Sequence, residues 1–206
     1  SAVVVKRDDT NGDVVVDTGT SNALLPRNEQ IPGEELYVGD RVRVFICEVG
    51  RVGERGPMVM LSRTHPAMVK RMFETEIPEI ADGIVLVKGV AREAGSRTKI
   101  AVMSRDENVD AVGACIGNRG MRINDIVSEL NGEKIDVIEY SENAEEYIAA
   151  ALSPATVREV EFDGERSAKV TVDGDQLSLA IGREGQNVRL AAKLVGYKID
   201  IKGVKI

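Results

Sequence analysis

The sequence contains few residues of the kinds that metal sites and most enzyme active sites use. Among its 206 residues are two cysteines, one histidine and no tryptophan. The cysteines, Cys47 and Cys115, lie far apart in unlike contexts, so we expect two reduced, buried thiols and neither a metal site nor a nucleophile. The histidine, His65, stands where a helix is expected to begin, and no paired carboxylates accompany it. We therefore predict a protein that is not an enzyme and that holds no metal and no cofactor.

Long hydrophobic runs are also missing. No apolar stretch approaches the length that crosses a bilayer, and the first residues do not form a signal peptide. The hydrophobic fraction of 43% is still enough for packed cores, and the charged fraction of 30% suits a soluble surface. We expect a cytoplasmic protein. Because the chain opens with Ser-Ala and not with Met, we also expect it to be a fragment of a longer protein.

An excess of positive charge is the third missing feature. The formal net charge is −7, and no third of the chain forms a basic arm. Proteins that coat nucleic acid without specificity rely on a broad basic surface. Any contact with nucleic acid must therefore be confined to a few cations at particular places.

What the sequence does contain is a short glycine motif that occurs twice. Residues 116–120 read IGNRG, and residues 181–185, which begin 65 residues later, read IGREG. Apolar residues after each motif recur at i, i+3, i+4 and i+7, the pattern of one helix face. These residues are Ile123, Ile126, Val127 and Leu130 in the first copy and Val188, Ala191, Ala192 and Val195 in the second. A lone GxxG is common by chance, but two copies in one frame indicate a duplicated domain.

Each motif has a direct chemical interpretation. One helix ends at the isoleucine and the next begins at the second glycine, so free N–H groups and the positive end of a helix dipole face the loop. Glycine at both ends removes Cβ atoms that would hold a sugar-phosphate chain away from the backbone. For either copy alone, a tight turn with a helix C-cap is the alternative. Two copies favour a phosphate-binding loop, and Arg119, Arg122, Arg183, Arg189 and Lys193 supply local cations.

The chain divides into three segments. Residues 1–64 carry short valine-rich strands separated by turn residues, which predicts a small β-barrel. The predicted strands are 2–6, 13–17, 41–49 and 57–62. Residues 65–140 and 141–206 each read as helix, strand, strand, short helix, glycine motif, helix and strand. No flexible linker separates these two copies, so we expect them to pack together and to present one continuous groove.

Helix caps are predicted at three places. Thr64 precedes Pro66 and is expected to cap the first helix of the middle segment. Asn108 and Asp173 are expected to cap the short helix before each glycine motif.

The order of elements around the motif is similar to that of the type II KH domain, and two such domains after a small barrel resemble the NusA family of transcription factors. The resemblance is carried by residues 112–117 (VGACIG), 131–136 (NGEKID), 151–154 (ALSP) and 180–187 (AIGREGQN). It implies a multidomain fold in which a small all-β OB-fold barrel of the S1 type precedes two α+β type II KH domains.

The resemblance also implies a function. Members of that family are bacterial elongation factors that bind nascent RNA and modulate pausing, termination and antitermination. The implied partners are single-stranded RNA, RNA polymerase and other antitermination factors, and the polymerase-binding N-terminal domain of the family is expected to be absent here. Each KH domain would clamp about four nucleotides, with the RNA backbone at the glycine loop and the bases in an apolar groove.

Sixteen residues are assigned to RNA contact on this basis. In the first copy they are Ile116, Gly117, Asn118, Arg119, Gly120, Arg122 and Ile123, and in the second Ile181, Gly182, Arg183, Glu184, Gly185, Gln186, Asn187, Val188 and Arg189. The apolar members would form the walls of the groove, while Gln186, Asn187 and Arg189 would add polar contacts. The carboxylate of Glu184 would repel phosphate unless it points outward or pairs with Arg183.

Two other interpretations remain open. In one, the loops are structural, the negative surface repels RNA and the chain is a protein-interaction module of a ribonucleoprotein. In the other, the chain belongs to an RNA-processing assembly. The barrel has only Tyr37 and Phe45 as aromatic residues for stacking bases, so we expect it to contribute weakly to RNA affinity.

Overall fold

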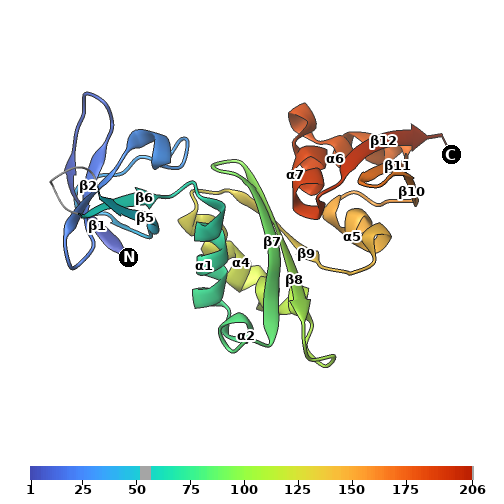
Figure 1. Cartoon of the computed structure of the whole chain (residues 1–206), viewed down its shortest axis with the longest axis horizontal. Coiled ribbons are helices and arrows are strands. Elements are labelled where there is room, and N and C mark those ends of the chain that lie inside the picture. Colours follow the sequence, from blue (N-terminus) through green and yellow to red (C-terminus); the bar gives the residue numbers. More distant parts are fainter. Residues whose placement is uncertain (52–56, 206) are drawn as a thin grey trace.

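The computed structural model describes residues 1–51 and 57–205, which form three units in chain order. The first and third units lie on opposite sides of the middle one (Figure 1). None of the helices within the described residues is both long and apolar enough to span a membrane.

The first unit is built from short antiparallel strands. Its elements are β1 (Ala2–Arg7), β2 (Val14–Asp17), β3 (Asn22–Leu25), a 3₁₀ turn η1 (Arg27–Glu29), β4 (Arg41–Val42), β5 (Phe45–Arg51) and β6 (Pro57–Ser62). Four strands pair in the order β3-β2-β1-β4, and β5 and β6 form a separate hairpin. Alternate residues such as Val4, Val14 and Val16 are buried in a common core. Among the described residues the hydrogen-bonded ladders do not close into a barrel, although β3 contacts β6.

Two sequence expectations for this unit are wrong, and one strand was not predicted. The predicted strand 41–49 is interrupted after Val42, where the side chain of Arg43 instead pairs with Glu76 and Glu129 of the middle unit. Strand β3 was missed because its sequence, NALL, has no β-branched residue. Cys47 is exposed, since a β-bulge between Ile46 and Glu48 interrupts the alternation of buried and exposed side chains.

The middle and third units share one topology, in the order predicted from the sequence. The middle unit contains α1 (Pro66–Glu76), α2 (Pro78–Ala81), β7 (Val85–Glu93), β8 (Arg97–Ser104), α3 (Ala111–Ile116), η3 (Asn118–Gly120), α4 (Met121–Glu129) and β9 (Lys134–Glu139). The third contains α5 (Ala144–Ala151), β10 (Glu159–Gly164), β11 (Ser167–Asp173), η4 (Gly174–Gln176), α6 (Leu177–Ile181), η5 (Arg183–Gly185), α7 (Gln186–Val195) and β12 (Lys198–Val204). In each, the first two strands are antiparallel and the last is parallel to the second.

The sheet of the middle unit is covered on both faces. Ile100 and Val102 of β8 pack with buried residues of α1 and α4. Ala101, between them, points to the opposite face and joins the core of the third unit together with Ile138 of β9. Helix α7 of the third unit contacts β7 and β8, and α5 contacts β9. The two units therefore pack directly against each other, as expected from the missing linker.

The cap of α1 differs from the prediction. His65, and not Thr64, is the N-cap residue, and its Nδ1 accepts a hydrogen bond from the N–H of Ala67 at 3.0 Å. Thr64 instead donates through its hydroxyl to the carboxylate of Glu29 at 3.0 Å. The caps predicted at Asn108 and Asp173 are also wrong, since neither side chain caps a helix; the residue before α3 is Asp110.

A buried cluster of charges links the middle and third units and gives a pH prediction. Lys99 donates through Nζ to Asp136 at 2.8 Å and to the carbonyl of Ser153 in the third unit at 2.7 Å, while Arg97 donates to Asp136 at 2.7 Å. Burial opposes ionisation of Asp136, but the hydrogen bond from Arg97 and the charge of Lys99 outweigh it and hold the pKa of this carboxyl below its ordinary 3.8. The ionised carboxylate therefore stabilises the fold above the ordinary pKa, and this contribution is lost as pH falls through the lower value of the folded state.

We expect the free energy of unfolding to fall on acidification below about pH 4, and Asp136→Asn to remove part of that dependence. Urea unfolding between about pH 2.5 and 6 measures both curves. Glu139→Gln, an exposed change in the same strand, is the control. Identical pH slopes for Asp136→Asn and the parent would contradict the prediction.

Candidate nucleic-acid interface

The two glycine loops have almost the same backbone conformation. The first glycines, Gly117 and Gly182, have φ/ψ of 77°/175° and 78°/171°. The second glycines, Gly120 and Gly185, both have 74°/13°. In both copies the N–H of the second glycine donates to the carbonyl of the first at 3.1 Å. The motif therefore specifies a defined turn in each unit, and the duplication read from the sequence extends to dihedral angles.

A non-glycine residue is held in the left-handed region at the third position of each loop. Arg119 has φ 54° and ψ 28°, and Glu184 has φ 55° and ψ 27°. For residues with a Cβ this conformation costs about 1–2 kcal/mol. Two unlike side chains in the same strained conformation indicate that the backbone, and not the side chain, is what the loop must present.

The loops deliver the chain directly to helix N-termini. Helix α4 begins after Gly120 and α7 after Gly185, and neither N-cap makes a side-chain hydrogen bond to its helix. The first N–H groups of each helix are consequently left without the usual side-chain acceptor, beside the positive end of the helix dipole. This is the arrangement that favours an anion.

The two positions of a loop favour glycine for different structural reasons, and the difference gives a stability prediction. The angles of Gly182 lie in a region that is essentially restricted to glycine, and an added Cβ would lie 2.7 Å from the backbone nitrogen of Asn187. Gly185 is in the left-handed helical region, which Asn tolerates, and its nearest neighbour would be a side-chain atom of Arg189 at 3.9 Å. We expect Gly182→Ala to lower the free energy of unfolding by about 1–3 kcal/mol and Gly185→Asn by less than about 1 kcal/mol.

Chemical unfolding of both variants measures this difference, and circular dichroism checks that the native helix content is kept. Gly132→Ala is the matched control for φ alone, because Gly132 has a positive φ of 84° but no atom within 4 Å of an added Cβ. Equal losses for Gly182→Ala and Gly132→Ala would show that the contact with Asn187 is unimportant.

The tips of the loops are open to solvent. Asn118, Arg119, Arg183 and Glu184 are all exposed. Among the described residues, neither Arg119 nor Arg183 takes part in an ion pair. These two guanidinium groups are therefore available to an anion at the loops.

Arg122 and Asn187 occupy matching positions and reach back to the helix before their loop. Arg122 donates to the carbonyl of Ala114 at 2.7 Å and to Glu79 of α2 at 2.8 Å. Asn187 is fully buried and donates through Nδ2 to the carbonyls of Ala180 and Leu152, at 2.9 and 3.0 Å. The expectation that Asn187 contacts a ligand at the surface is therefore wrong for this conformation, because its amide holds the loop in place from beneath.

Gln186 and Arg189, predicted as polar contacts beyond the second loop, both reach the middle unit. Gln186 donates through Nε2 to the hydroxyl of Ser96 at 2.6 Å, and Arg189 forms an ion pair with Glu93 at 2.6 Å. Arg189 also donates to the carbonyl of Glu184 at 3.0 Å. These contacts attach the second loop to the turn between β7 and β8. The second loop is thus held against the end of the middle unit's first hairpin.

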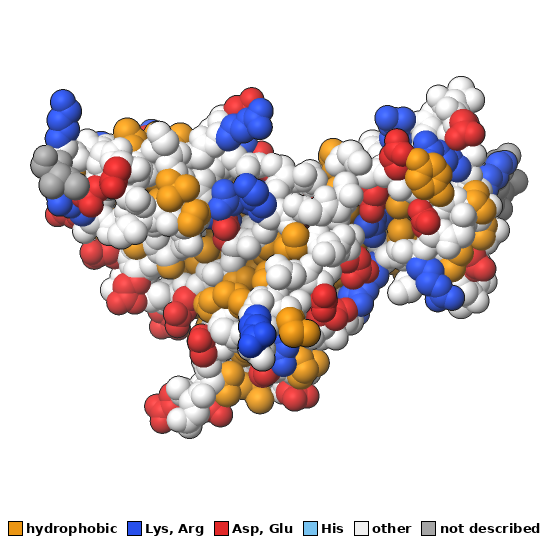
Figure 2. Space-filling view, turned by 180° about the vertical axis from the view of Figure 1, so that it is seen from behind, with side chains coloured by type: hydrophobic (Ala, Val, Ile, Leu, Met, Phe, Trp, Pro, Cys, Tyr) orange, Lys and Arg blue, Asp and Glu red, His pale blue; other side chains and the backbone are white. Residues whose placement is uncertain are grey.

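The apolar members of the predicted set are only partly covered. Ile116 is 38% exposed, and Ile123, Ile181 and Val188 are half-buried. Ile126, on the same apolar helix face as Ile123, is fully buried. Figure 2 shows hydrophobic side chains exposed over the middle of the molecule's rear face, with basic and acidic groups around them.

Sequence reasoning missed two exposed apolar residues near the loops. Met121, the first residue of α4, is 64% exposed, and Leu179 in α6 is 42% exposed. Met121 could have been recognised from the sequence, because an apolar residue begins this helix where the second copy has the polar Gln186. Cys115, just before the first loop, is fully buried. Burial raises the pKa of its thiol to about 12, so the side chain stays neutral and packs as an apolar residue.

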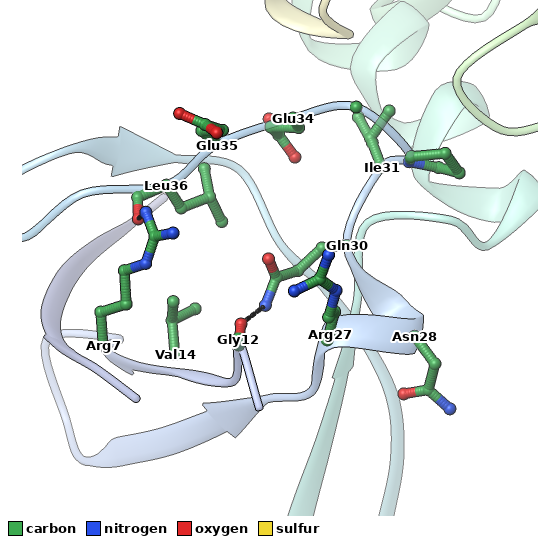
Figure 3. Close-up of a pocket in the computed structure, with 12 residues that line it drawn as sticks. Arg7, Gly12, Val14, Arg27, Asn28, Gln30, Ile31, Glu34, Glu35 and Leu36 are labelled. Carbon is green, nitrogen blue, oxygen red and sulfur yellow. Dashed lines mark hydrogen bonds between the residues drawn. The ribbon is translucent and has the colours of Figure 1, made fainter. Parts of the chain in front are cut away.

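The first unit contains a hollow, and one of its lining residues, Pro32, lies next to Gly95 in the turn between β7 and β8. The hollow has a volume of about 400 Å³, and Arg7, Arg27, Gln30, Glu34 and Glu35 are among its lining residues (Figure 3). Gln30 donates to the carbonyl of Gly12 at 2.9 Å across it. Charges of both signs line this hollow, and it includes no residue assigned to RNA contact.

Comparison with known proteins gives matches over both glycine-loop units. The model of a NusA-like first KH domain matches residues 63–140, and that of a NusA-like second KH domain matches residues 144–206. Together these two matches extend over well more than half of the chain.

Named relatives cover the first unit as well. Proteins named transcription termination/antitermination protein NusA are 52% identical in Halalkalibacterium halodurans, 50% in Bacillus subtilis and 47% in Thermus thermophilus. These alignments cover 97%, 97% and 98% of this chain, but 52%, 53% and 52% of the respective relatives. The chain thus spans about half the length of the curated relatives it matches.

Proposed function

Because the chain belongs to the family of the transcription termination/antitermination protein NusA and carries its two KH domains, we propose that it binds single-stranded RNA through the two glycine loops. The sugar-phosphate backbone lies against the loop amides of Gly117–Gly120 and Gly182–Gly185, next to the guanidinium groups of Arg119 and Arg183. The bases lie on the apolar walls, which include Ile116, Ile123, Ile181 and Val188, together with Met121 and Leu179.

The single observation that supports this proposal most strongly is the identity of the two loop backbones. The tips read Asn-Arg in one copy and Arg-Glu in the other, yet φ of the third residue differs by only a degree between them. A purely structural turn does not require an arginine and a glutamate to be held in the left-handed region. A loop that presents its amides to a phosphate does, because the direction of each N–H depends on the backbone angles.

The contacts beside the two loops indicate how far apart the two sites lie. Arg122, beside the first loop, contacts α2, which precedes the start of β7, whereas Gln186 and Arg189, beside the second loop, contact the turn after the end of β7. Strand β7 is nine residues long, or roughly 30 Å. Each domain holds about four nucleotides, so an RNA strand that passes from one site to the next has about eight nucleotides bound in all.

The first unit is proposed to be an S1 domain of the OB class, with domain boundaries at residues 1–64, 65–140 and 141–206. It has few aromatic residues on which bases could stack, so we expect it to contribute little to RNA affinity. In the whole protein we propose a bacterial, cytoplasmic elongation factor that contacts RNA polymerase and other antitermination factors and modulates pausing, termination and antitermination.

A salt titration tests the proposal. Binding of a fluorescent single-stranded RNA of about twelve nucleotides is expected to weaken with salt, and log Kd should rise with log salt at a slope of about 1.5–3, corresponding to two to four phosphate contacts. Fluorescence anisotropy measures this slope, and a duplex of the same sequence is the control. If no RNA binding were detected at low salt, the chain would instead be a protein-interaction module.

A further inference from the structure

An exposed aromatic and basic cluster lies at the end of the third unit opposite its glycine loop. The ring of Phe162, at the end of β10, is 48% exposed, and its centroid lies 5.8 Å from that of Tyr197, which precedes β12. The guanidinium of Arg166, in the turn between β10 and β11, lies 5.2 Å from the centroid of the Tyr197 ring. We refer to Phe162, Arg166 and Tyr197 as the distal cluster.

The strand registers identify the part of the middle unit that corresponds to the distal cluster. Lys134 pairs with Arg97 in the middle unit, and Lys198 pairs with Ser167 in the third unit. The turn between β10 and β11 therefore corresponds to the turn between β7 and β8. By the same registers Phe162 matches Arg92 and Tyr197 matches Glu133. In the middle unit these two residues form a fully buried ion pair, beneath the turn that receives Gln186 and Arg189 of the second loop.

The distal cluster is therefore the second copy of a surface that, in the first copy, meets the next RNA-binding loop. No further loop covers it here, since Phe162 and Arg166 remain exposed within the described chain. The third unit has replaced a closed ion pair with two aromatic rings and an arginine. That substitution exposes flat apolar faces where the other unit has none.

The charges around the cluster are mixed, because Arg166 is exposed and so are Glu161 and Glu165, which directly precede Phe162 and Arg166 in the sequence. Arg166 forms no ion pair among the described residues. The nearby carboxylate of Asp163 points to the other face of the hairpin, where it lies 3.9 Å from Lys169. Helix α7, which runs from the second loop to the cluster, has ten residues and is about 15 Å long. A strand that continued from the second loop along α7 would meet the cluster at the far end of this helix.

We propose that the distal cluster is a base-stacking subsite for single-stranded RNA that extends beyond the second KH site. A base stacks on the exposed ring of Phe162, and Arg166 faces the adjoining phosphate or base. Aromatic and arginine planes stack bases without sequence preference. This inference rests on the proposed function, since it requires the strand to be held at the second loop.

RNA length separates the two proposals. Phe162→Ala is expected to leave the Kd of an eight-nucleotide RNA unchanged and to weaken a twelve-nucleotide RNA about fivefold or more, as stacking on an aromatic side chain predicts. Arg166→Gln, which changes no core residue, should act in the same direction. Phe162→Tyr keeps the ring and should bind both RNAs like the parent.

A second measurement reports stacking itself. Two twelve-nucleotide RNAs are used, one with 2-aminopurine near the 5′ end and one with it near the 3′ end. The parent protein and Phe162→Tyr should quench the fluorescence of one of these RNAs. Phe162→Ala should quench neither. If the eight-nucleotide RNA binds but Phe162→Ala changes neither the longer RNA's Kd nor the quenching, the subsite is refuted and the surface belongs to a protein partner. If the eight-nucleotide RNA does not bind at all, the proposed function fails.

Discussion

Replacing the four loop-tip residues with aspartate is expected to abolish RNA binding while leaving the protein folded. The variant carries Asn118→Asp, Arg119→Asp, Arg183→Asp and Glu184→Asp. All four side chains are exposed, and Asp tolerates the left-handed conformation of positions 119 and 184, so the loops should keep their shape. The two free guanidinium groups are removed and carboxylates are placed beside the amides that would hold phosphate.

The expected loss of affinity is at least about 100-fold, because two charge-assisted contacts worth about 1.5–3 kcal/mol each are replaced by repulsion. Anisotropy at about 0.1 M salt measures it, with thermal unfolding as a check on the fold. Lys169→Glu with Lys202→Glu is the matched control: it removes two exposed cations from the strands of the third unit, away from both loops. RNA binding by the folded aspartate variant at parental strength would refute the loop assignment, and a comparable loss in the control would point to net charge as the cause.

Truncating Glu133 is expected to produce the largest loss of stability among the changes considered. Its buried carboxylate accepts from Arg92, from the N–H of Gly95 at 2.7 Å and from the hydroxyl of Thr98 at 2.7 Å. Both side chains of the Arg92–Glu133 pair are 0% exposed. Glu133→Ala leaves the guanidinium of Arg92 buried without its counter-charge, which typically costs 3–5 kcal/mol.

Urea unfolding measures this loss, and Glu139→Ala, an exposed glutamate in the same strand, is the control. Glu133→Gln should cost less, because an amide still accepts some of the hydrogen bonds. The network holds the turn that contacts the second loop, so Glu133→Ala should also weaken RNA that spans both sites more than RNA that occupies one. A loss below about 1 kcal/mol would mean that Arg92 finds another partner or reaches water.

Local patterns predicted much of the architecture. The predicted strands 2–6 and 57–62 agree with β1 and β6 to within one residue, since valine and the flanking turn residues signal strands within a few positions. The two helices after the loops follow from the spacing of their apolar residues. Prediction failed where the local signal was weak or shared. Strand β3 lacks β-branched residues, and α1 follows four adjacent polar residues, 62–65, more than one of which could serve as its cap.

The sequence predicted which cations lie near the loops, but not which of them are paired with neighbouring residues. The sequence placed Arg119, Arg122, Arg183 and Arg189 together as cations near the loops. The structure leaves Arg119 and Arg183 unpaired within its described residues and gives Arg122 and Arg189 partners. Gln186 and Asn187 are adjacent in sequence, yet one reaches the middle unit and the other is buried in the third. Adjacent helix positions point in different directions, and only their surroundings determine what they meet.

By itself, then, the sequence determined that two copies of one unit exist and that each contains a glycine loop leading into a helix. Repetition, glycine placement and apolar periodicity are local properties of the chain, and they need no knowledge of distant residues. Only the tertiary structure decided which loop side chains remain free, that the middle sheet is covered on both faces, and which turn meets the second loop. Those outcomes depend on contacts between residues about 90 positions apart, such as Gln186 with Ser96 and Arg189 with Glu93, whose pairing no local pattern records.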